Sequence, residues 1–109
     1  MTPEGKVKDE IDDYLKSLGT DCWYFKPMNM GYGKNGIPDY ITCYRGFFLA
    51  PEAKRKKGGK SEAWQERQQA EIRAAGGVSS RVTSVDEVKE WVAYIDSYGL
   101  LLPKWGAAY

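Results

Sequence analysis

The first segment of the chain repeats apolar residues every three or four positions, which is the period of one face of an α-helix. Thr2 followed by Pro3 is typical of a helix start, because a threonine side chain caps free backbone N–H groups and proline fits the first turn. Gly19 follows the last apolar position and favours a helix end. We therefore expect a helix over residues 3–18 with an apolar face of Val7, Ile11, Tyr14, Leu15 and Leu18.

Three runs rich in aromatic and β-branched residues come next and predict strands at 22–25, 40–44 and 47–50. A glycine-rich connection over 27–36 separates the first two strands. Only Arg45-Gly46 lies between the second and the third, which predicts a hairpin with a two-residue turn. Pairing across such a turn joins residues whose numbers sum to 91.

The second half of the sequence predicts a helix, a strand and a further helix. Ser61 is placed to cap a helix over 61–75, and residues 78–83 are typical of a strand. Ser84 and Glu87 have the spacing of a capping box, in which each side chain binds the backbone N–H of the other residue. The helix that follows has an apolar stripe of Val85, Val88, Trp91, Val92 and Ile95.

The predicted element order is therefore αβββαβα. An antiparallel hairpin joined to a βαβ-type unit gives an α/β fold with a mixed β-sheet flanked by helices. The chain has 109 residues, of which 42% are apolar and 14% aromatic, so we expect one compact domain over residues 1–109.

Composition excludes several classes of chemistry. Histidine is absent, which rules out Ser-His-Asp triads, Cys-His pairs and HEXXH zinc sites. No apolar run approaches the roughly 18 residues of a membrane span, and the N-terminus lacks the apolar segment of a secretory signal. We expect a cytoplasmic protein without a membrane partner. Cys22 and Cys43 are too far apart for a CxxC metal site, and we expect both to be buried free thiols in strands.

Charged residues flank the predicted hairpin: Pro38-Asp39 precedes it, and Glu52-Ala53-Lys54 follows it. Across a two-residue turn, Asp39 faces Glu52 at about 4.5–5.5 Å on one face of the sheet, and Lys54 shares that face. Two carboxylates about 5 Å apart repel by roughly 3 kcal/mol at an effective dielectric constant near 20. A divalent cation would remove this cost, since carboxylate oxygens are the ligands that Mg²⁺ and Mn²⁺ prefer. Lys54 would then orient a water molecule or offset charge on a phosphate group.

A simpler interpretation stays open at this point. Asp39 would only begin a turn, and Glu52 and Lys54 would be solvated residues on an exposed strand face. An odd loop length would move Asp39 to the other face of the sheet. Because Pro51 has no N–H to donate, we expect the strand to bulge or to end its pairing just before Glu52.

These motifs, taken with the element order, resemble a known family. The runs Gly36-Ile37-Pro38-Asp39-Tyr40 and Glu52-Ala53-Lys54-Arg55, with Gln65 eleven residues before Gly76, resemble the VRR-NUC domain, the virus-type replication-repair branch of the PD-(D/E)xK nuclease superfamily. The resemblance covers nearly the whole chain and implies a restriction-endonuclease-like fold. It also implies that Asp39 and Glu52 bind Mg²⁺ or Mn²⁺ and that Lys54 assists the attacking water.

The same resemblance implies two further site residues. The family places a metal-binding glutamate on the first helix, a position that Glu4 fits because apolar residues follow it at +3 and +7, with Glu10 as the alternative. The family also places a glutamine on the helix after the ExK strand, where it would orient the lysine or the water. Gln65 fits this position best, and Gln68 or Gln69 would lie one turn further along the helix.

Positive charge is concentrated in one short stretch, although the formal net charge is only +1. Basic residues crowd positions 54–60 around Gly58-Gly59, which favours anion binding. Within this stretch Lys54 is the catalytic candidate. The 27–36 connection carries or adjoins two more lysines and would add phosphate contacts, or it is a plain linker. We expect the following residues to contact DNA phosphates, which gives affinity without base readout: Arg55, Lys56, Lys57, Lys60, Lys26 and Lys34.

We therefore expect an endonuclease that depends on Mg²⁺ or Mn²⁺ and hydrolyses phosphodiester bonds in DNA. The resemblance implies more, since small stand-alone members of the family occur in phages and can act as homodimers on branched DNA such as four-way (Holliday) junctions. An apolar C-terminal tail is our candidate for part of a dimer interface, and packing on its own domain is the alternative. The tail residues concerned are Leu100–Leu102, Trp105 and Tyr109.

Two other functions remain open. In the first, the chain would be a nucleic-acid-binding module of the same fold that has lost its catalytic activity. Pro51 favours this interpretation weakly, because the family usually has a bulky aliphatic residue at that position. Alternatively it would be a structural homodimer held by the apolar tail, which predicts no metal binding.

Overall fold

The computed structural model describes residues 1–28 and 36–98, and every predicted helix and strand is present there. The element order αβββαβα and the mixed α/β class are confirmed. Two sets of residues named above lie outside the described residues, namely Lys34 in segment 29–35 and the tail residues Leu100–Leu102, Trp105 and Tyr109 in segment 99–109.

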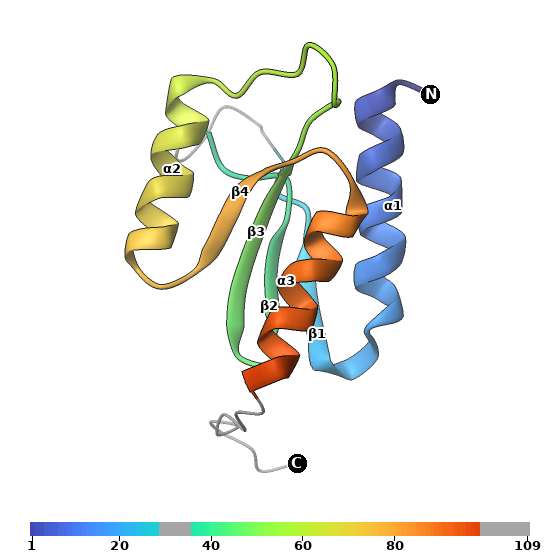
Figure 1. Cartoon of the computed structure of the whole chain (residues 1–109), viewed down its shortest axis with the longest axis vertical. Coiled ribbons are helices and arrows are strands. Elements are labelled where there is room, and N and C mark those ends of the chain that lie inside the picture. Colours follow the sequence, from blue (N-terminus) through green and yellow to red (C-terminus); the bar gives the residue numbers. More distant parts are fainter. Residues whose placement is uncertain (29–35, 99–109) are drawn as a thin grey trace.

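Figure 1 shows the arrangement of the elements. Thr2 caps the first helix, as predicted, by accepting a hydrogen bond from the N–H of Gly5 at 3.0 Å. None of the helices in the described residues is long and apolar enough to cross a membrane. The elements are α1 (Pro3–Ser17), the short 3₁₀ helix η1 (Gly19–Asp21), β1 (Cys22–Phe25), β2 (Ile41–Tyr44), β3 (Phe47–Ala53), α2 (Ala63–Ala74), β4 (Val78–Val82) and α3 (Val85–Tyr98).

The four strands form one sheet in the order β1-β2-β3-β4, with antiparallel pairing except between β3 and β4, which are parallel. The turn between β2 and β3 has two residues, as predicted, because Tyr44 pairs with Phe47. Arg45 and Gly46 have φ angles of 50° and 89°, and positive values are what both central residues of a type I′ turn require. The predicted register of the hairpin is therefore confirmed.

β3 continues through Pro51 to Ala53 in unbroken register with β4, so the expectation that the strand bulges or ends its pairing just before Glu52 holds only for its pairing with β2. Pairing with β2 does stop at Leu49, but pairing with β4 extends to Ala53. Backbone N–H groups alternate in direction along β3, since that of Ala53 donates to Asp39 on the β2 side and that of Lys54 donates to β4. The nitrogen of Pro51 therefore faces the β2 side beyond the last β2–β3 pair, where no sheet hydrogen bond is lost.

α1 and α3 lie side by side over one face of the sheet (Figure 1). Tyr40, which is 1% exposed, fills the core beneath α1, and its hydroxyl donates to the carbonyl of Lys8 at 2.6 Å. This bond ties the segment just before β2 to the first helix. The apolar stripes predicted for both helices are buried here, in a core that contains Ile11, Leu15, Tyr40, Tyr44, Leu49, Ala53, Val82, Val88, Val92 and Ile95.

α2 packs on the opposite face of the sheet, mainly against β4, and reaches β3 through the hydrogen bond from Gln65 to Glu52 (Figure 1). The outer face of β1 and β2 is left open, and the side chains of Trp23 and Phe25 on it are 63% and 45% exposed; Phe48, which pairs with Cys43 from the uncovered start of β3, is 40% exposed. Cys43 belongs to this open face and is exposed, so the prediction that it is buried is wrong. Cys22 points to the core side and is half-buried. The sequence pattern of an aromatic-rich strand is the same whether or not a helix covers the strand, so the exposure of Cys43 could not be predicted from it.

Two helix starts differ slightly from the prediction. Glu62, and not Ser61, is the N-cap of α2, where it forms a capping box with Gln65. At α3, the carboxylate of Glu87 accepts the N–H of Thr83 at 2.7 Å, one residue before the serine expected to pair with it. At α2 the carboxylate of Glu62 thus takes the capping role expected of Ser61, and at α3 the carboxylate of Glu87 accepts the N–H one residue before the one expected.

Candidate active site

Asp39 and Glu52 lie together at the open end of the β2–β3 hairpin. The N–H of Asp39 donates to Glu52 Oε2 at 3.0 Å, and the N–H of Ala53 donates to Asp39 Oδ2 at 2.8 Å. Each carboxylate thus accepts a backbone N–H from the other side of the hairpin. These two bonds extend the hairpin beyond its last ladder pair and hold the carboxylates in the cross-strand relation expected from the sequence.

Lys54 belongs to the same cluster. Its Nζ lies 3.7 Å from Glu52 Oε1, and its side chain is only 13% exposed. Its backbone N–H donates to the carbonyl of Val82 at 2.9 Å, which fixes the residue beside β4. An ammonium group partly shielded from water exerts a stronger field on its neighbours than one in bulk solvent. The structure therefore brings Asp39, Glu52 and Lys54 together.

Gln65 connects α2 to this cluster. Its Nε2 donates to Glu52 Oε1 at 2.7 Å, while its Oε1 accepts the N–H of Glu62 at 2.9 Å. Because the N–H of Glu62 can only donate, the amide oxygen must face it, and the NH₂ group must face the carboxylate. Among the candidate glutamines, Gln65 is thus the one in contact with the site, whereas Gln69 is buried one turn further along the helix.

Glu4 reaches the site only through a lysine. Lys8, one turn after Glu4 on α1, has its Nζ 3.5 Å from Glu4 Oε2 and 3.7 Å from Asp39 Oδ1. Glu10, the alternative helix residue, is exposed and makes no ion pair among the described residues. Our sequence reasoning missed Lys8, although its i,i+4 spacing from Glu4 on a predicted helix is a signal that finds it.

The surroundings of Asp39 and Glu52 disfavour the negatively charged forms of both carboxylates. Glu52 is 3% exposed, and burial, followed by the neighbouring Asp39 carboxylate, raises its pKa to about 7, although Lys54 acts in the opposite direction. Burial also raises the pKa of Asp39 above its usual range, against the N–H of Ala53 and the ammonium of Lys8. In the metal-free protein, burial and the neighbouring carboxylate therefore favour the protonated form of Glu52 more than Lys54 opposes it.

This donor set fits a hard divalent cation. Burial and the neighbouring Asp39 carboxylate both raise the pKa of Glu52, so a nearby cation would stabilise its charged form. Oxygen is also the ligand atom that Mg²⁺ and Mn²⁺ prefer. Within the described residues, no three acidic, cysteine or histidine side chains converge closely enough to surround an ion. Mg²⁺ is usually bound by only one or two carboxylates together with waters and substrate phosphates, so Asp39 and Glu52 suffice as the core of such a site.

Gly36 positions the segment that carries Asp39. It has a φ of 78°, and a Cβ atom added to it would lie 2.5 Å from the carbonyl oxygen of Trp64 in the first turn of α2. No side chain fits in this space, so the backbone before β2 can lie directly against the start of α2. This contact brings the Asp39 segment and Gln65 to the same corner of the sheet.

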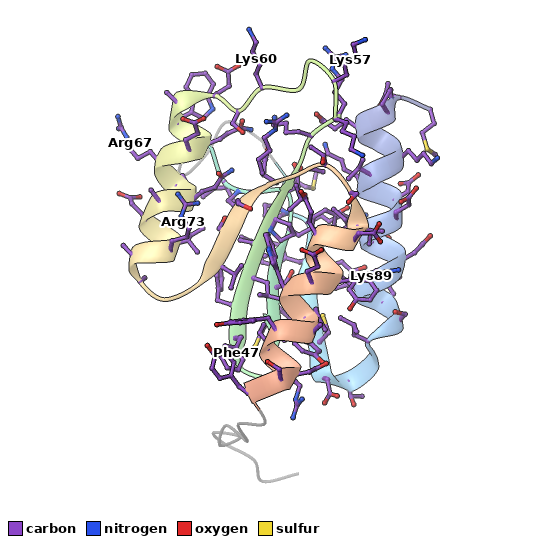
Figure 2. The ribbon with its side chains drawn as sticks, viewed as in Figure 1. Phe47, Lys57, Lys60, Arg67, Arg73 and Lys89 are labelled. Carbon is purple, nitrogen blue, oxygen red and sulfur yellow. The ribbon has the colours of Figure 1, made fainter. Side chains whose placement is uncertain are left out.

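A basic loop borders the site. It joins β3 to α2, and Figure 2 shows its residues Lys57 and Lys60 pointing away from the domain. A hollow of about 320 Å³ lies between this loop and the N-terminus of α1. Lys26, by contrast, pairs with Asp12 at 3.4 Å and is tied to α1. The hollow is lined by Thr2, Pro3, Glu4, Lys54, Arg55, Gly58, Gly59 and Lys60, while Lys56 is exposed on the same loop.

No protein-family model and no curated protein matches the sequence. The structure is similar to a solved structure described as "VRR_NUC domain", with a TM-score of 0.69 and 24% sequence identity over 86% of this chain and 98% of that one. The elements around Asp39, Glu52 and Lys54 therefore occur in an architecture already known from another protein. The chain has the VRR-NUC fold, as the resemblance of its motifs predicted.

Proposed function

We propose that this protein is a nuclease that depends on Mg²⁺ or Mn²⁺ and hydrolyses phosphodiester bonds in DNA. One observation supports this proposal most strongly: two hydrogen-bonded carboxylates, Asp39 and Glu52, meet a shielded lysine and an oriented glutamine at the border of a basic loop. An ordinary solvated strand face would have no reason to bury Glu52 to 3% exposure beside another acid.

Asp39 and Glu52 would hold the metal ion, and Glu4 is the candidate for a third ligand. When bound, the ion would supply positive charge that stabilises the reacting phosphate and makes a water molecule more acidic. The protein's own groups do the rest. Gln65 fixes the orientation of Glu52, and Lys54 places an ammonium group where charge builds up on the phosphate.

The loop between β3 and α2 would hold the DNA backbone. Arg55 and Lys60 line the hollow beside Lys54, and Lys56 and Lys57 are exposed on the same loop. Contacts of this kind bind phosphates irrespective of sequence and weaken steeply as salt rises. Lys26 is a weaker candidate because its ammonium already pairs with Asp12.

We further propose that the substrate is branched DNA and that the protein acts as a homodimer. Each chain offers a single carboxylate cluster and a single basic loop among its described residues, whereas cutting two opposed strands of a four-way junction requires two sites related by symmetry. The open face of β1 and β2, with Trp23 and Phe25, is a candidate interface in addition to the apolar tail.

A cleavage assay tests this function. Labelled linear, flapped and four-way-junction DNA would be incubated with Mg²⁺, Mn²⁺ or Ca²⁺, using the parent protein and the variants Asp39→Asn, Glu52→Gln and Lys54→Met. We expect cutting with Mg²⁺ or Mn²⁺, and a loss of at least about 100-fold in each variant, which is the usual effect of removing a catalytic group.

Lys89→Met is the matched control for Lys54→Met, because it removes the same positive charge from a different place. Lys89 lies on α3, over the ring of Tyr14. It should cut like the parent protein. Folded variants that retain the parental rate would show that the assigned cluster is not catalytic. DNA binding without cutting under every metal condition would favour a nucleic-acid-binding module of the same fold that has lost its catalytic activity.

A further inference from the structure

Lys8 occupies a position that neither the motifs nor the proposed reaction accounts for. Its ammonium lies 3.5 Å from Glu4 Oε2 and 3.7 Å from Asp39 Oδ1, so one cation bridges two candidate metal ligands. We propose that Lys8 is a positioning residue that serves as an internal counter-ion, holding Glu4 and Asp39 together in the metal-free protein and giving way when a divalent ion binds. This inference rests on the proposed metal-dependent function.

The backbone of Lys8 is fixed by the same segment that supplies Asp39. Tyr40, the residue after Asp39, donates its hydroxyl proton to the carbonyl of Lys8 at 2.6 Å and is itself buried. The helix then sets the spacing to Glu4, because residues four apart lie on one face of α1. Lys8 is therefore aimed at the two carboxylates by the fold, and not only by their attraction.

The oxygen that faces Lys8 is the one left for a cation. Asp39 Oδ2 accepts the N–H of Ala53 at 2.8 Å, and Oδ1 is the oxygen that faces the ammonium. A metal ion bound by both Asp39 and Glu4 would have to approach the carboxylate oxygens that now face Lys8. The ammonium of Lys8 and the ion would therefore compete for these oxygens.

The second lysine of the site has a different partner. Lys54 faces Glu52 Oε1 at 3.7 Å, whereas Lys8 faces Asp39 and Glu4. The side chain of Lys8 is also 41% exposed, compared with 13% for Lys54, so Lys8 has solvent into which it can withdraw. Of the two lysines, Lys8 is the one placed to be displaced.

The test is metal affinity measured without DNA. Isothermal titration calorimetry with Mn²⁺ would compare the parent protein with Lys8→Met and with the control Lys6→Met, which removes an equal charge from an exposed position on the same helix. Two partly exposed ion pairs together correspond to a factor of about 2 to 30 in an equilibrium constant. We expect Lys8→Met to bind Mn²⁺ several-fold more tightly than the parent, Lys6→Met to change less than about two-fold, and Lys8→Arg to retain the parental affinity.

Melting temperatures give a second measurement. Lys8→Met should melt below Lys6→Met without metal, because two carboxylates lose their counter-ion, and saturating Mn²⁺ should abolish that difference. If Lys8→Met does not fold, Lys8→Gln is measured against the same criteria. If folded Lys8→Met or Lys8→Gln binds Mn²⁺ no more tightly than the parent protein, the counter-ion role is overturned and the proposed function stands. Absence of Mn²⁺ binding in the parent protein would overturn both.

Discussion

At the scale of single residues, Glu52 determines how the stability of the metal-free protein depends on pH. Its folded-state pKa of about 7 lies above the ordinary value of 4.5, so the folded protein binds more protons than the unfolded chain between these two pH values. The free energy of unfolding therefore falls as pH rises through this window, by about 3 kcal/mol in total if Glu52 acts alone. Asp39, whose pKa is also raised, acts in the same direction.

Urea unfolding without metal at pH 5, 6 and 7.5 measures this effect. Glu52→Gln should flatten the pH dependence, because the variant has no proton to lose, even though its amide satisfies only one of the two hydrogen bonds that Glu52 accepts. Parent and variant curves that fall equally with pH would show that Glu52 is not the group responsible.

Gln65 offers a second prediction, since one amide both caps α2 and orients Glu52. Gln65→Ala should lower the cleavage rate roughly 10- to 100-fold, as loss of a supporting hydrogen bond at a metal site commonly does. It should also cost about 1 kcal/mol of stability, because the capping box is lost. Gln68→Ala, on the same helix, is the control and should change neither the rate nor the urea midpoint appreciably. Equal effects of the two substitutions would remove the special role of Gln65.

At the scale of secondary-structure elements, Gly36 controls how the Asp39 segment meets α2. Gly36→Ala introduces a Cβ atom 2.5 Å from the Trp64 carbonyl and also places alanine at a φ of 78°. Gly19→Ala separates these causes, because Gly19 has a similar φ of 67° with no atom within 4 Å. We expect about 1 kcal/mol of destabilisation for Gly19→Ala, and at least about 2 kcal/mol for Gly36→Ala, where the clash adds to the strain. Thermal unfolding of both variants decides, and similar losses would show that the backbone contact yields easily.

Local sequence signals predicted the elements well because each was encoded within a few residues. The apolar periods of α1 and α3 and the two-residue turn at Arg45-Gly46 are of this kind, and the turn alone placed Asp39 opposite Glu52. The predictions that failed depend on contacts with distant parts of the chain. Pro51 is tolerated because β4, and not β2, pairs with that part of β3. Cys43 is exposed because α2 packs mainly on β4, at the other edge of the sheet from β1.

The site was predictable to the same extent. Spacing around the hairpin selected Asp39, Glu52 and Lys54, and the resemblance selected Gln65, all of which the structure brings together. Their chemical roles stay predictions. Lys8 was missed because its importance depends on where α1 lies relative to the segment before β2, and that relation comes from the buried Tyr40 and not from any local pattern.

At the scale of the whole molecule, the proposed homodimer makes a joint prediction about assembly and substrate. Sedimentation at tens of micromolar protein should show a two-fold dimer, and cleavage at matched ionic strength should be faster on four-way junctions than on linear duplex. Trp23→Ser with Phe25→Ser, and separately a chain ending at Tyr98, should show which apolar surface holds the dimer, since only the responsible change produces monomers. A parent monomer that cuts linear duplex as readily as junctions would contradict both assignments while leaving the nuclease chemistry in place.

The hydrogen bonds of the candidate site also determine which of its residues report activity in related sequences. Asp39, Glu52 and Gln65 each bind a backbone N–H, so a descendant that no longer cuts DNA would still need them to close its hairpin and to start its second helix. The ammonium of Lys54 makes no hydrogen bond to the backbone among the described residues; it offsets the buried charge of Glu52, and protonation of Glu52 would make that task unnecessary after the loss of catalysis. Among relatives that share this architecture, a change at the lysine position is therefore the earliest sign of lost cleavage, whereas retention of the other three shows only that the domain still folds.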